Sequence, residues 1–555
     1  MKLVTVAEMQ KVEREANSSG FTYEMMMEHA GQNLARAVID SYDLIGNKSA
    51  LGLIGSGNNG GDTLVALASL AEQEWKTTAY IVRPRPEDDP LVSRFIEAGG
   101  TVYSLEEGDL EPDGRLKTLV DDHAVLLDGV LGTGFRLPLK SELAEVLDAV
   151  RQMLAEMASP PFVVAVDVPS GVDCDSGEAA PECIPADLTV TMAAVKSGLL
   201  KFPAFKYIGD LQVVDIGLPE GGQGYKSWKS IHRSVADRDT VRDSLPHRPA
   251  DAHKGTFGTV FGILGSINYT GAALLAGEAA YRIGAGLVTL AVPAPLHTIL
   301  AGQFVEATWV LLPHEMGVIS ENAEGVVRKN LGRATSLLFG CGFGLEETTR
   351  RFIERLIGAS SPARRAGIGF QHEPEIGKVQ KKEKESGAQL PPLVVDADGL
   401  KLLAKIPDWF TYLPAPAVLT PHPGEMSVLT GIPADEIQAD RIGTAERFAK
   451  EWGHVVVLKG AFTVVASPDG QTTIIPVASA ALARAGTGDV LAGLITGLRA
   501  QGLEAYPAAV AGAWIHAQAG LQAAVSIGNT ASVLAGDILE AVSQVLTDYD
   551  LIQEN

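Results

Sequence analysis

The 555-residue sequence has few cysteines, a deficit of positive charge and no long uninterrupted apolar run. Its three cysteines, Cys174, Cys183 and Cys341, form no C-x-x-C pair, so we expect reduced thiols rather than a disulfide framework. Lys and Arg total 45 against 68 Asp and Glu, which gives a formal net charge of -23. So acidic a chain repels nucleic acid and anionic membranes, and we expect neither as a partner.

The longest apolar segments carry polar side chains in their interior. Segment 271–292 is interrupted by Glu278 and segment 505–525 by His516, so we interpret both as buried helices and not as membrane spans. The first residues of the chain include acidic side chains where a secretory signal would need an apolar stretch. Together with the sparse thiols, this pattern leads us to expect a cytoplasmic location.

Hydrophobic residues, in contrast, are plentiful at 46%, and 555 residues exceed what one core usually organises. Short β-branched runs such as 51–55, 77–82 and 162–168 alternate with segments of helical periodicity. This alternation predicts the α/β class, with parallel sheets and crossover helices in each half. A stretch rich in Pro, Gly and charge at 218–250 interrupts the pattern and predicts a domain boundary at about residues 225 to 240.

Two segments of the second half have their own character. The residues at about 360–390 are charged and lack periodicity, which predicts a mobile insertion. The segment FTVVASPDGQTTIIPV predicts a β-hairpin that turns at Asp469-Gly470.

A glycine-rich segment follows the first strong strand. Gly55, Gly57 and Gly60 fit the G-x-G-x-x-G pattern, in which glycine lets the backbone approach a phosphate at a helix start. A Rossmann dehydrogenase also needs an acidic residue after the next strand, but Arg83 stands there. The sequence therefore disfavours a nicotinamide-dependent dehydrogenase.

Oxygen-bearing side chains occur near the ends of three predicted strands. Residues 58–62 (NNGGD) form a predicted tight loop, Asp128 precedes a glycine-rich segment, and Asp167 is followed by a turn that contains Ser170. The carboxyl ends of parallel strands meet at one edge of a sheet, where α/β proteins bind ligands. Amide and carboxylate oxygens suit a hard cation or sugar hydroxyls. Each aspartate alone could equally cap a helix, but the three segments together favour a binding site.

Taken in order, the motifs NNGGD, DGVLGTGF, VDVPSGVD and TVTMAAVKSGL resemble the NAD(P)H-hydrate epimerase family. The resemblance covers roughly residues 1–220, within a predicted domain of residues 1–225. It implies a three-layer Rossmann-like fold that interconverts the R and S epimers of the hydrated nicotinamide ring. It implies a bound potassium ion held by Asn59, Asp128 and Ser170, and it places Asp167 beside the reacting ring. We predict that Asp167 is the proton-transfer group, and a purely orienting role is the alternative. The substrate contacts that the resemblance implies are Asn58, Asn59, Gly60, Gly61, Asp62, Gly132, Thr133, Gly134, Phe135, Arg136, Leu137, Pro138 and Asp167.

Two further residues of this half are notable. Thr63 stands where the family usually has glycine, a change that would narrow the predicted loop. Lys196 follows a strand and could pair with a phosphate or a carboxylate. For a single lysine, a surface salt bridge is the expectation.

The second half contains the segment AGTGD at 485–489, directly before a predicted helix. Backbone amides of successive glycines at a helix N-terminus form a nest for a transferring phosphoryl group. Asp489 at the same helix start could accept a proton from an attacking hydroxyl. A simple turn followed by a helix cap is the alternative.

Three other segments of this half end predicted strands. Residues 459–463 would form a platform for a nucleotide, or an ordinary turn into the hairpin. His422 lies between prolines that fix its loop, and no second histidine has the spacing that zinc requires. Asp396 and Asp398 could hold magnesium through water, or cap the next helix.

The motifs HKGTFGTVFGILGSINYTGAALLA, VVDADGL, LTPHPGE, LKGAFT and AGTGDVLAG resemble the NAD(P)H-hydrate dehydratase family, a member of the ribokinase-like superfamily. The resemblance covers about residues 250–545, within a predicted domain of residues 235–555, and implies a ribokinase-like α/β domain with Mg²⁺ and ADP. It implies phosphorylation of the ring hydroxyl, with Asp489 as the base, and then loss of phosphate. Nucleotide contacts would be Lys459, Gly460, Ala461, Phe462, Thr463 and Gly488, and contacts with the hydrated dinucleotide would be Ala272, Gly342, His422 and Asp489.

The second half also departs from its family. Cys341 stands where the family usually shows proline between two glycines, and the residues before Gly486 lack the usual Asn-Pro. Two alternatives therefore remain beside a bifunctional repair enzyme. One is a kinase of a vitamin or sugar, and the other is a dinucleotide-binding protein with one inactive half. The expected partners are hydrated NADH and NADPH with an adenine nucleotide, and we expect a homo-oligomer.

Overall fold

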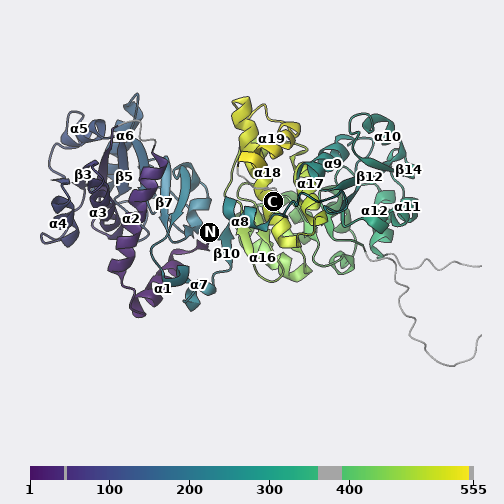
Figure 1. Cartoon of the computed structure of the whole chain (residues 1–555), viewed down its shortest axis with the longest axis horizontal. Helices are drawn as coiled ribbons and strands as arrows, with labels where there is room; N and C mark the ends of the chain where they lie inside the picture. The colour runs from purple at the N-terminus through teal and green to yellow at the C-terminus, as the bar shows by residue number, and fades with distance from the viewer. Residues whose placement is uncertain (43–46, 360–389, 549–555) are drawn as a thin grey trace, which may run out of the picture. The chain divides into compact units, whose positions relative to one another are not determined.

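The computed structural model describes residues 1–42, 47–359 and 390–548. The chain divides into two compact units, Met1–Val235 and Ala236–Asn555, drawn from purple to blue-green and from teal to yellow in Figure 1. The mobile insertion predicted at about 360–390 lies, apart from its last residue, outside the described residues. Among the described residues, no helix combines the length and apolar character needed to cross a membrane.

The first unit is built on a parallel sheet with the strand order β4-β3-β2-β5-β6-β7-β9. Its strands are β2 (Ser49–Ile54), β3 (Lys76–Ile81), β4 (Thr101–Ser104), β5 (Val125–Gly129), β6 (Phe162–Val166), β7 (Leu188–Met192) and β9 (Asp210–Val214). The remaining strands are β1 (Leu3–Val4), which pairs in parallel with β8 (Val195–Lys196), and β10 (Arg233–Val235). The helices are α1 (Val6–Ser18), α2 (Tyr23–Ser41), α3 (Asn58–Ala71), α4 (Pro90–Glu97), α5 (Arg115–Asp122), α6 (Ser141–Glu156) and α7 (Lys226–Lys229), with short 3-10 turns η1 (Ser197–Leu200), η2 (Ala204–Lys206) and η3 (Pro219–Gly222).

Helices cover both faces of this sheet because successive strand residues point to opposite sides. Leu51 and Leu53 of β2 pack in one core with residues of α5 and α6. Ala50 and Ile54 of the same strand pack in a second core with residues of α1, α2, α3 and α4. The three-layer α/β arrangement predicted from the sequence is thereby confirmed.

The NNGGD segment differs from its prediction, because it forms the first turn of α3 and not a tight loop. Its glycines serve close packing. A Cβ on Gly60 would lie 2.1 Å from the carbonyl oxygen of Gly55, and one on Gly61 would lie 2.7 Å from the Met27 sulfur. Gly57, in extended backbone, caps the helix. The motif therefore presents the amide groups of a helix start and not the flexible backbone of a loop.

The sheet of the second unit contains the strand order β21-β20-β19-β18-β17-β16-β11-β12-β13. Pairs from β19 to β13 are parallel, whereas β19, β20 and β21 pair antiparallel. The strands are β11 (Thr259–Ile263), β12 (Leu287–Pro293), β13 (Thr308–Leu312), β16 (Ser336–Phe339), β17 (Leu393–Val395), β18 (Val418–Leu419), β19 (Val455–Leu458), β20 (Val464–Ala466) and β21 (Thr472–Ile474), beside the separate hairpin β14 (His314–Glu315) and β15 (Val318–Ile319). The hairpin predicted to turn at Asp469-Gly470 is confirmed, and Gly470 supplies the positive φ of +93°.

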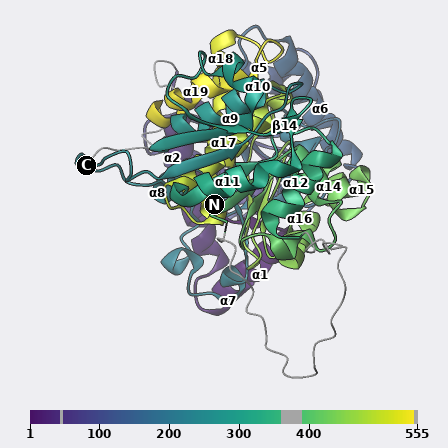
Figure 2. The ribbon, with the colours of Figure 1, turned by 90° about the vertical axis from the view of Figure 1, so that its right-hand side faces the viewer.

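Helices surround this second sheet. They are α8 (Arg238–Ser244), α9 (Gly271–Arg282), α10 (Ala294–Leu300), α11 (Glu324–Asn330), α12 (Glu347–Ile357), α13 (Asp398–Leu403), α14 (Pro423–Thr430), α15 (Ala434–Ala439), α16 (Arg441–Trp452), α17 (Thr487–Ala500), α18 (Ala505–Ile527) and α19 (Ala535–Asp548), with 3-10 turns η4 (Glu321–Ala323), η5 (Leu331–Arg333), η6 (Trp409–Tyr412) and η7 (Ala480–Leu482). In Figure 2, α9, α17, α18 and α19 lie together in the upper part, apart from α12, α14 and α16. Their alanine-rich faces form one core with the strands. The segment 505–525 is a buried helix as predicted, whereas 271–292 contains α9 and then most of β12.

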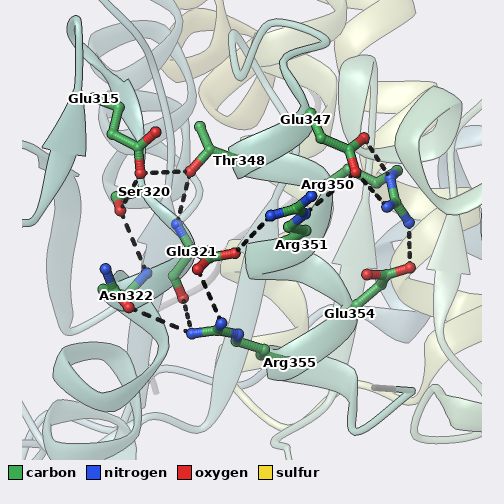
Figure 3. A network of polar contacts seen from close by, with 10 residues as sticks. All are labelled: Glu315, Ser320, Glu321, Asn322, Glu347, Thr348, Arg350, Arg351, Glu354 and Arg355. Atoms are coloured by element: carbon green, nitrogen blue, oxygen red, sulfur yellow. Dashed lines mark hydrogen bonds and ion pairs between the residues drawn. The ribbon is translucent and has the colours of Figure 1, made fainter. Parts of the chain in front are cut away.

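A network of polar contacts joins α12 to the β14–β15 hairpin and the turn after it (Figure 3). Arg355 pairs with Glu321 at 3.0 Å, and the Thr348 hydroxyl donates to Glu315 at 2.9 Å. Exposed ion pairs of this kind contribute little individually, but as a network they hold the hairpin against α12. The residues drawn are Glu315, Ser320, Glu321, Asn322, Glu347, Thr348, Arg350, Arg351, Glu354 and Arg355.

Candidate active sites

A cavity of about 790 Å³ opens at the carboxyl ends of strands β2, β5 and β6 of the first unit. Most of the predicted substrate residues line it, namely Asn58, Asn59, Asp62, Gly132, Thr133, Gly134, Phe135, Arg136, Leu137, Pro138 and Asp167. Gly60 and Gly61 lie behind this surface, in the packing contacts described above. Arg83, which the dehydrogenase test singled out, also lines the cavity. Parallel strand ends have thus gathered these segments at one place.

Asp128, Ser170 and Asn59 form a buried polar group beside the cavity. The Asp128 carboxylate accepts hydrogen bonds from the Ser170 backbone at 2.8 Å and from its hydroxyl at 2.5 Å. Among the described residues, no cationic side chain pairs with Asp128, and its burial raises the pKa of the carboxyl. Asn59 donates to the backbone carbonyl of Val166 at 2.5 Å, which leaves its own amide oxygen toward Gly132. A buried carboxylate with neutral oxygen neighbours fits a monovalent hard cation.

Asp167 is held in an unusual backbone conformation at the end of β6, with a φ of +64°. Its carboxylate accepts hydrogen bonds from the Met192 amide at 2.9 Å and the Thr191 hydroxyl at 3.1 Å, and it pairs with the Lys196 ammonium. Lys196 is only 2% exposed, so the predicted surface salt bridge is wrong in its location. Lys196 is the last residue of β8, and its position is fixed by the short parallel pairing of β8 with β1. Strain of this kind often marks functional positions.

Two more carboxyl groups face this cavity, and one of them was missed by the sequence analysis. Asp62 is buried, and its pKa is raised well above the usual value by burial and by the charges of Asp167 and Glu13. Glu13 lies on α1, and burial raises its pKa as well. The helical periodicity of α1 could have predicted that Glu13 faces inward, because it is four residues after Met9 and three before Ala16, both of which are buried.

Arg85 is a second residue that the sequence analysis did not identify. Its guanidinium donates to the carbonyl oxygen of Gly55 at 2.8 Å and pairs with Asp89 at 2.6 Å. This contact fixes the turn before α3. Thr63, the departure from the family pattern, is buried, donates to the backbone of Asn59 and fills the space next to Gly129. It therefore packs beneath the site without entering the cavity.

In the second unit, Asp489 lies in the first turn of α17 and meets two other side chains. Ligand atoms of Asp489, Asp396 and Cys341 all lie within 4.8 Å of one another. Burial and the charge of Asp396 raise the pKa of Asp489 to about 7, although the Cys341 thiol beside it acts in the other direction. A carboxyl group with such a pKa can exchange a proton at neutral pH, which is the property of a general base.

Lys459 joins the predicted nucleotide segment to this group. Its ammonium lies 2.6 Å from Asp396 and 3.7 Å from Glu425. Burial alone would lower the pKa of Lys459, but these two carboxylates raise it above the usual value. A Cβ on Gly488 would lie 3.4 Å from the lysine nitrogen, so the loop before α17 directly adjoins the lysine.

The aspartates after β17 have distinct partners. Asp396 also accepts from the buried Thr420 hydroxyl at 2.7 Å. Asp398 begins α13, accepts from the Gly344 amide at 3.0 Å and pairs with Lys401 at 3.1 Å. Ala397 between them has a φ of +53°, which turns the two carboxylates in different directions. The helix-cap alternative is wrong, because Ala397 is the N-cap of α13 and no side chain caps this helix. The amide that Asp398 bonds belongs to Gly344, outside the helix, so a role as cation ligand stays a prediction.

His422 caps α14 with its ring. Its Nδ1 atom accepts hydrogen bonds from the amides of Gly424 at 3.0 Å and Glu425 at 3.3 Å. Burial lowers the pKa of the histidine, so the ring is neutral at physiological pH. Only the Nε2 atom, which lies 3.3 Å from Glu425, is left to contact a ligand.

The other predicted contact residues of the second unit are Ala272, Gly342 and the turn 459–463. Gly342, with a φ of +69°, lies against Ala272, since a Cβ on the glycine would be 2.8 Å from the alanine methyl. In the turn 459–463, the Thr463 hydroxyl donates to the Gly460 carbonyl at 3.0 Å. Arg441, which the sequence analysis missed, donates to the Leu458 carbonyl at 2.9 Å and supports this turn from α16.

Comparison with known proteins links both units to described families. Residues 23–198 match the family of the YjeF-related protein N-terminus, and residues 260–364 and 366–544 match the NAD(P)H-hydrate dehydratase family. A bifunctional NAD(P)H-hydrate repair enzyme of Moorella thermoacetica is 35% identical over 99% of this chain and 97% of its own length. The chain belongs to the family of bifunctional NAD(P)H-hydrate repair enzymes.

Other relatives carry the same description. The bifunctional NAD(P)H-hydrate repair enzyme of Thermofilum pendens is 32% identical over 100% of this chain and 98% of its own length. Among solved structures, an ADP/ATP-dependent NAD(P)H-hydrate dehydratase from Bacillus subtilis, co-crystallised with ATP and Mg²⁺, is 25% identical. It covers 57% of this chain and 98% of its own, with a TM-score of 0.44.

Proposed function

We propose that this chain repairs hydrated NADH and NADPH by two successive activities. The epimerase domain, residues 1–225, interconverts the R and S hydrates, and the dehydratase domain, residues 235–555, returns the S hydrate to NAD(P)H with ADP as phosphoryl donor. The single observation that carries the proposal is Asp489, a carboxyl group with a pKa of about 7 at a glycine-rich helix start beside Lys459. Full-length similarity to repair enzymes supports the pairing of both activities in one chain.

In the epimerase domain, Asp167 is the proton-transfer group. Its carboxylate lines the cavity, and its pairing with the buried Lys196 fixes its orientation. Asn59, Asp128 and Ser170 hold potassium, as the buried and cation-free carboxylate of Asp128 suggests. Potassium supplies positive charge there. The predicted contacts at 58–62 and 132–138 bind the hydrated dinucleotide.

In the dehydratase domain, the turn 459–463 and Gly488 bind the adenine nucleotide. Ala272, Gly342, His422 and Asp489 bind the hydrated dinucleotide. Among the residues that the structure describes, carboxylates outnumber lysines in this region, since Lys401 and Lys459 face four acidic side chains, namely Asp396, Asp398, Glu425 and Asp489. That excess fits Mg²⁺ at Asp396 and Asp398, where the ion would neutralise phosphate charge.

Asp489 performs the chemical step in this proposal. Its carboxylate accepts the proton of the ring hydroxyl while the hydroxyl oxygen bonds to the terminal phosphorus of ADP and AMP leaves. The phosphorylated carbon is bonded to the ring nitrogen, whose lone pair then expels phosphate. Loss of a proton from the neighbouring carbon restores the double bond. Lys459 holds positive charge beside the transferring group.

The test gives the protein a mixture of R and S hydrates of NADH with ADP or with ATP. Full recovery of the dihydronicotinamide absorbance supports both activities. Recovery that stops at the S fraction, after subtraction of spontaneous epimerisation, contradicts an active epimerase. Lack of recovery with either nucleotide contradicts the dehydratase, and accumulation of a stable phosphorylated product would support a small-molecule kinase instead.

We also propose a cytoplasmic homo-oligomer, as expected from the sequence. Light scattering after size-exclusion chromatography measures the mass of the particle directly. A mass of 58.4 kDa, that of one chain, at all concentrations would contradict oligomerisation.

A further inference from the structure

We infer that Glu13 is a second acid–base residue of the epimerase cavity, acting on the hydrated ring together with Asp167. This inference rests on the proposed epimerase activity. It concerns a residue on α1 that lies outside every motif of the first half. Both side chains line the same cavity of about 790 Å³ but come from different elements, α1 and the end of β6.

Glu13 differs from the other acids of its helix in having no partner. Among the described residues, its carboxyl group forms neither a hydrogen bond nor an ion pair. Glu8 completes the capping box with Thr5, and Glu15 accepts from the Ser227 amide at 3.0 Å. A partly buried carboxyl without a partner is costly, and it is retained where it has a ligand to contact.

The charges around the cavity leave a proton available. Glu13, Asp62 and Asp167 face one buried cation, Lys196, and Asp167 pairs with that lysine directly. Three more cationic side chains line the cavity, but among the described residues none of them forms an ion pair with these carboxyl groups; they are Arg83, Arg136 and Lys140. Arg14 also affects Glu13 from the same helix, but it is exposed and is a weaker influence than Lys196. Since one lysine cannot neutralise three carboxylates, the state with one of them protonated is favoured. The site thus holds a carboxylic acid and a carboxylate at once.

Inversion of the hydrated ring carbon by loss and re-addition of water uses such a pair. Hydration of an enamine places the hydroxyl on the carbon bonded to the ring nitrogen. A carboxylic acid donates its proton to this hydroxyl, the carbon–oxygen bond breaks, and the nitrogen lone pair forms a carbon–nitrogen double bond as water leaves. A water molecule then adds to the opposite face and gives its proton to a carboxylate. The sum is one water lost and one gained, and Glu13 and Asp167 exchange roles with the direction of reaction.

The experiment compares Glu13→Gln, Glu13→Asp and wild type in the full chain, starting from purified R hydrate and following its conversion to the S hydrate. We expect Glu13→Gln to lower kcat about 100-fold or more with little change in KM, and Glu13→Asp to lose less. Wild type should show two limbs in its pH profile, of which Glu13→Gln lacks one. In water enriched in oxygen-18, the epimerised product of wild type should carry the label. Glu145→Gln, on the exposed face of α6, is the matched control.

The outcomes separate this inference from the proposed function. A wild-type rate of epimerisation no higher than the spontaneous rate would contradict the proposed epimerase activity itself. An active wild type with an unchanged kcat in Glu13→Gln, or a loss confined to KM, overturns the role of Glu13. Dehydration of the S hydrate by the same preparations, together with thermal unfolding, establishes that the variants are folded. If Glu13→Gln is unstable, partial activity of Glu13→Asp with a shifted pH limb supports the inference, and wild-type behaviour of that variant refutes it.

Discussion

In each unit a lysine pairs with an aspartate at the end of a parallel strand. The two pairs differ in whether the paired aspartate is itself the proposed proton-transfer group. In the first unit, the paired aspartate is Asp167, which itself faces the cavity. In the second, the paired aspartate is the buried Asp396, and the proposed base is its neighbour Asp489. The lysine is fully enclosed in the first case, whereas the Lys459 side chain is 17% exposed in the second.

This difference separates two ways of preparing a carboxyl group. Asp167 is oriented by a cation and by backbone strain, so its removal or that of its lysine should disturb the fold as well as the reaction. Among the described residues, Asp489 forms no ion pair, and burial next to Asp396 raises its pKa to about 7. The dehydratase should therefore respond to pH, and the epimerase to the loss of its ion pair.

The largest effect is expected from Asp489→Asn. Loss of the proton acceptor should lower the rate of dehydration by about 10² to 10⁴ and leave epimerisation unchanged. Absorbance recovery from the S hydrate with ADP measures the first rate, and conversion of the R hydrate measures the second. Asp435→Asn, on the exposed start of α15, should retain both. Full dehydration by Asp489→Asn would exclude Asp489 as the base.

Lys196→Met should destabilise the first unit by about 3 to 5 kcal/mol, because it leaves a buried carboxylate without its cation. Denaturant unfolding measures the change, and Lys206→Met is a matched control at an exposed site. Lys459→Met should cost less, since that lysine is partly exposed and Asp396 keeps its bond to Thr420. Equal costs at the two lysines would contradict the distinction between the pairs.

The pH dependence of dehydration should follow Asp489. Because its pKa is raised to about 7 and the base must be ionised, the rate should fall about tenfold per pH unit below that value. A profile of kcat/KM for the S hydrate between pH 5 and 9 checks the direction. Loss of activity on raising the pH through 7 would mean that the protonated form is the active one.

The smallest effect is expected from Cys341→Ala. The thiol donates its hydrogen bond to Asp396 at 3.7 Å, and its position beside Asp489 favours the ionised form of that carboxyl group. Its removal should therefore raise the pKa of Asp489 by less than about one unit. The acidic limb of the profile should then move to higher pH. A shift toward lower pH would show that burial by the Cys341 side chain outweighs this effect of the thiol.

Features that local patterns determine could be predicted from the sequence. Parallel strands bring their carboxyl ends to one edge, so the neighbourhood of Asp128 and Asp167 was predictable from strand ends alone. The NNGGD turn was misjudged because its glycines suggested a loop, whereas they allow α3 to approach Gly55 and Met27.

Other features depend on contacts between distant segments. The burial of Lys196 follows from the pairing of β8 with the N-terminal β1. Glu13 and Arg85 reach the site from α1 and from the segment after β3, and neither belongs to a recognisable motif. These positions depend on how distant segments pack in the folded chain, so they could not be predicted from one sequence.

The pKa of Asp489 has a consequence for the timing of repair. Water adds to the nicotinamide enamine faster in acid, because protonation of the ring carbon precedes attack by water. Acidification of the surroundings would therefore raise the demand for repair while it protonates Asp489, the proposed base of the dehydration step. With Asp489 as that base, hydrated cofactor would accumulate during an acid episode and be cleared once neutrality returns.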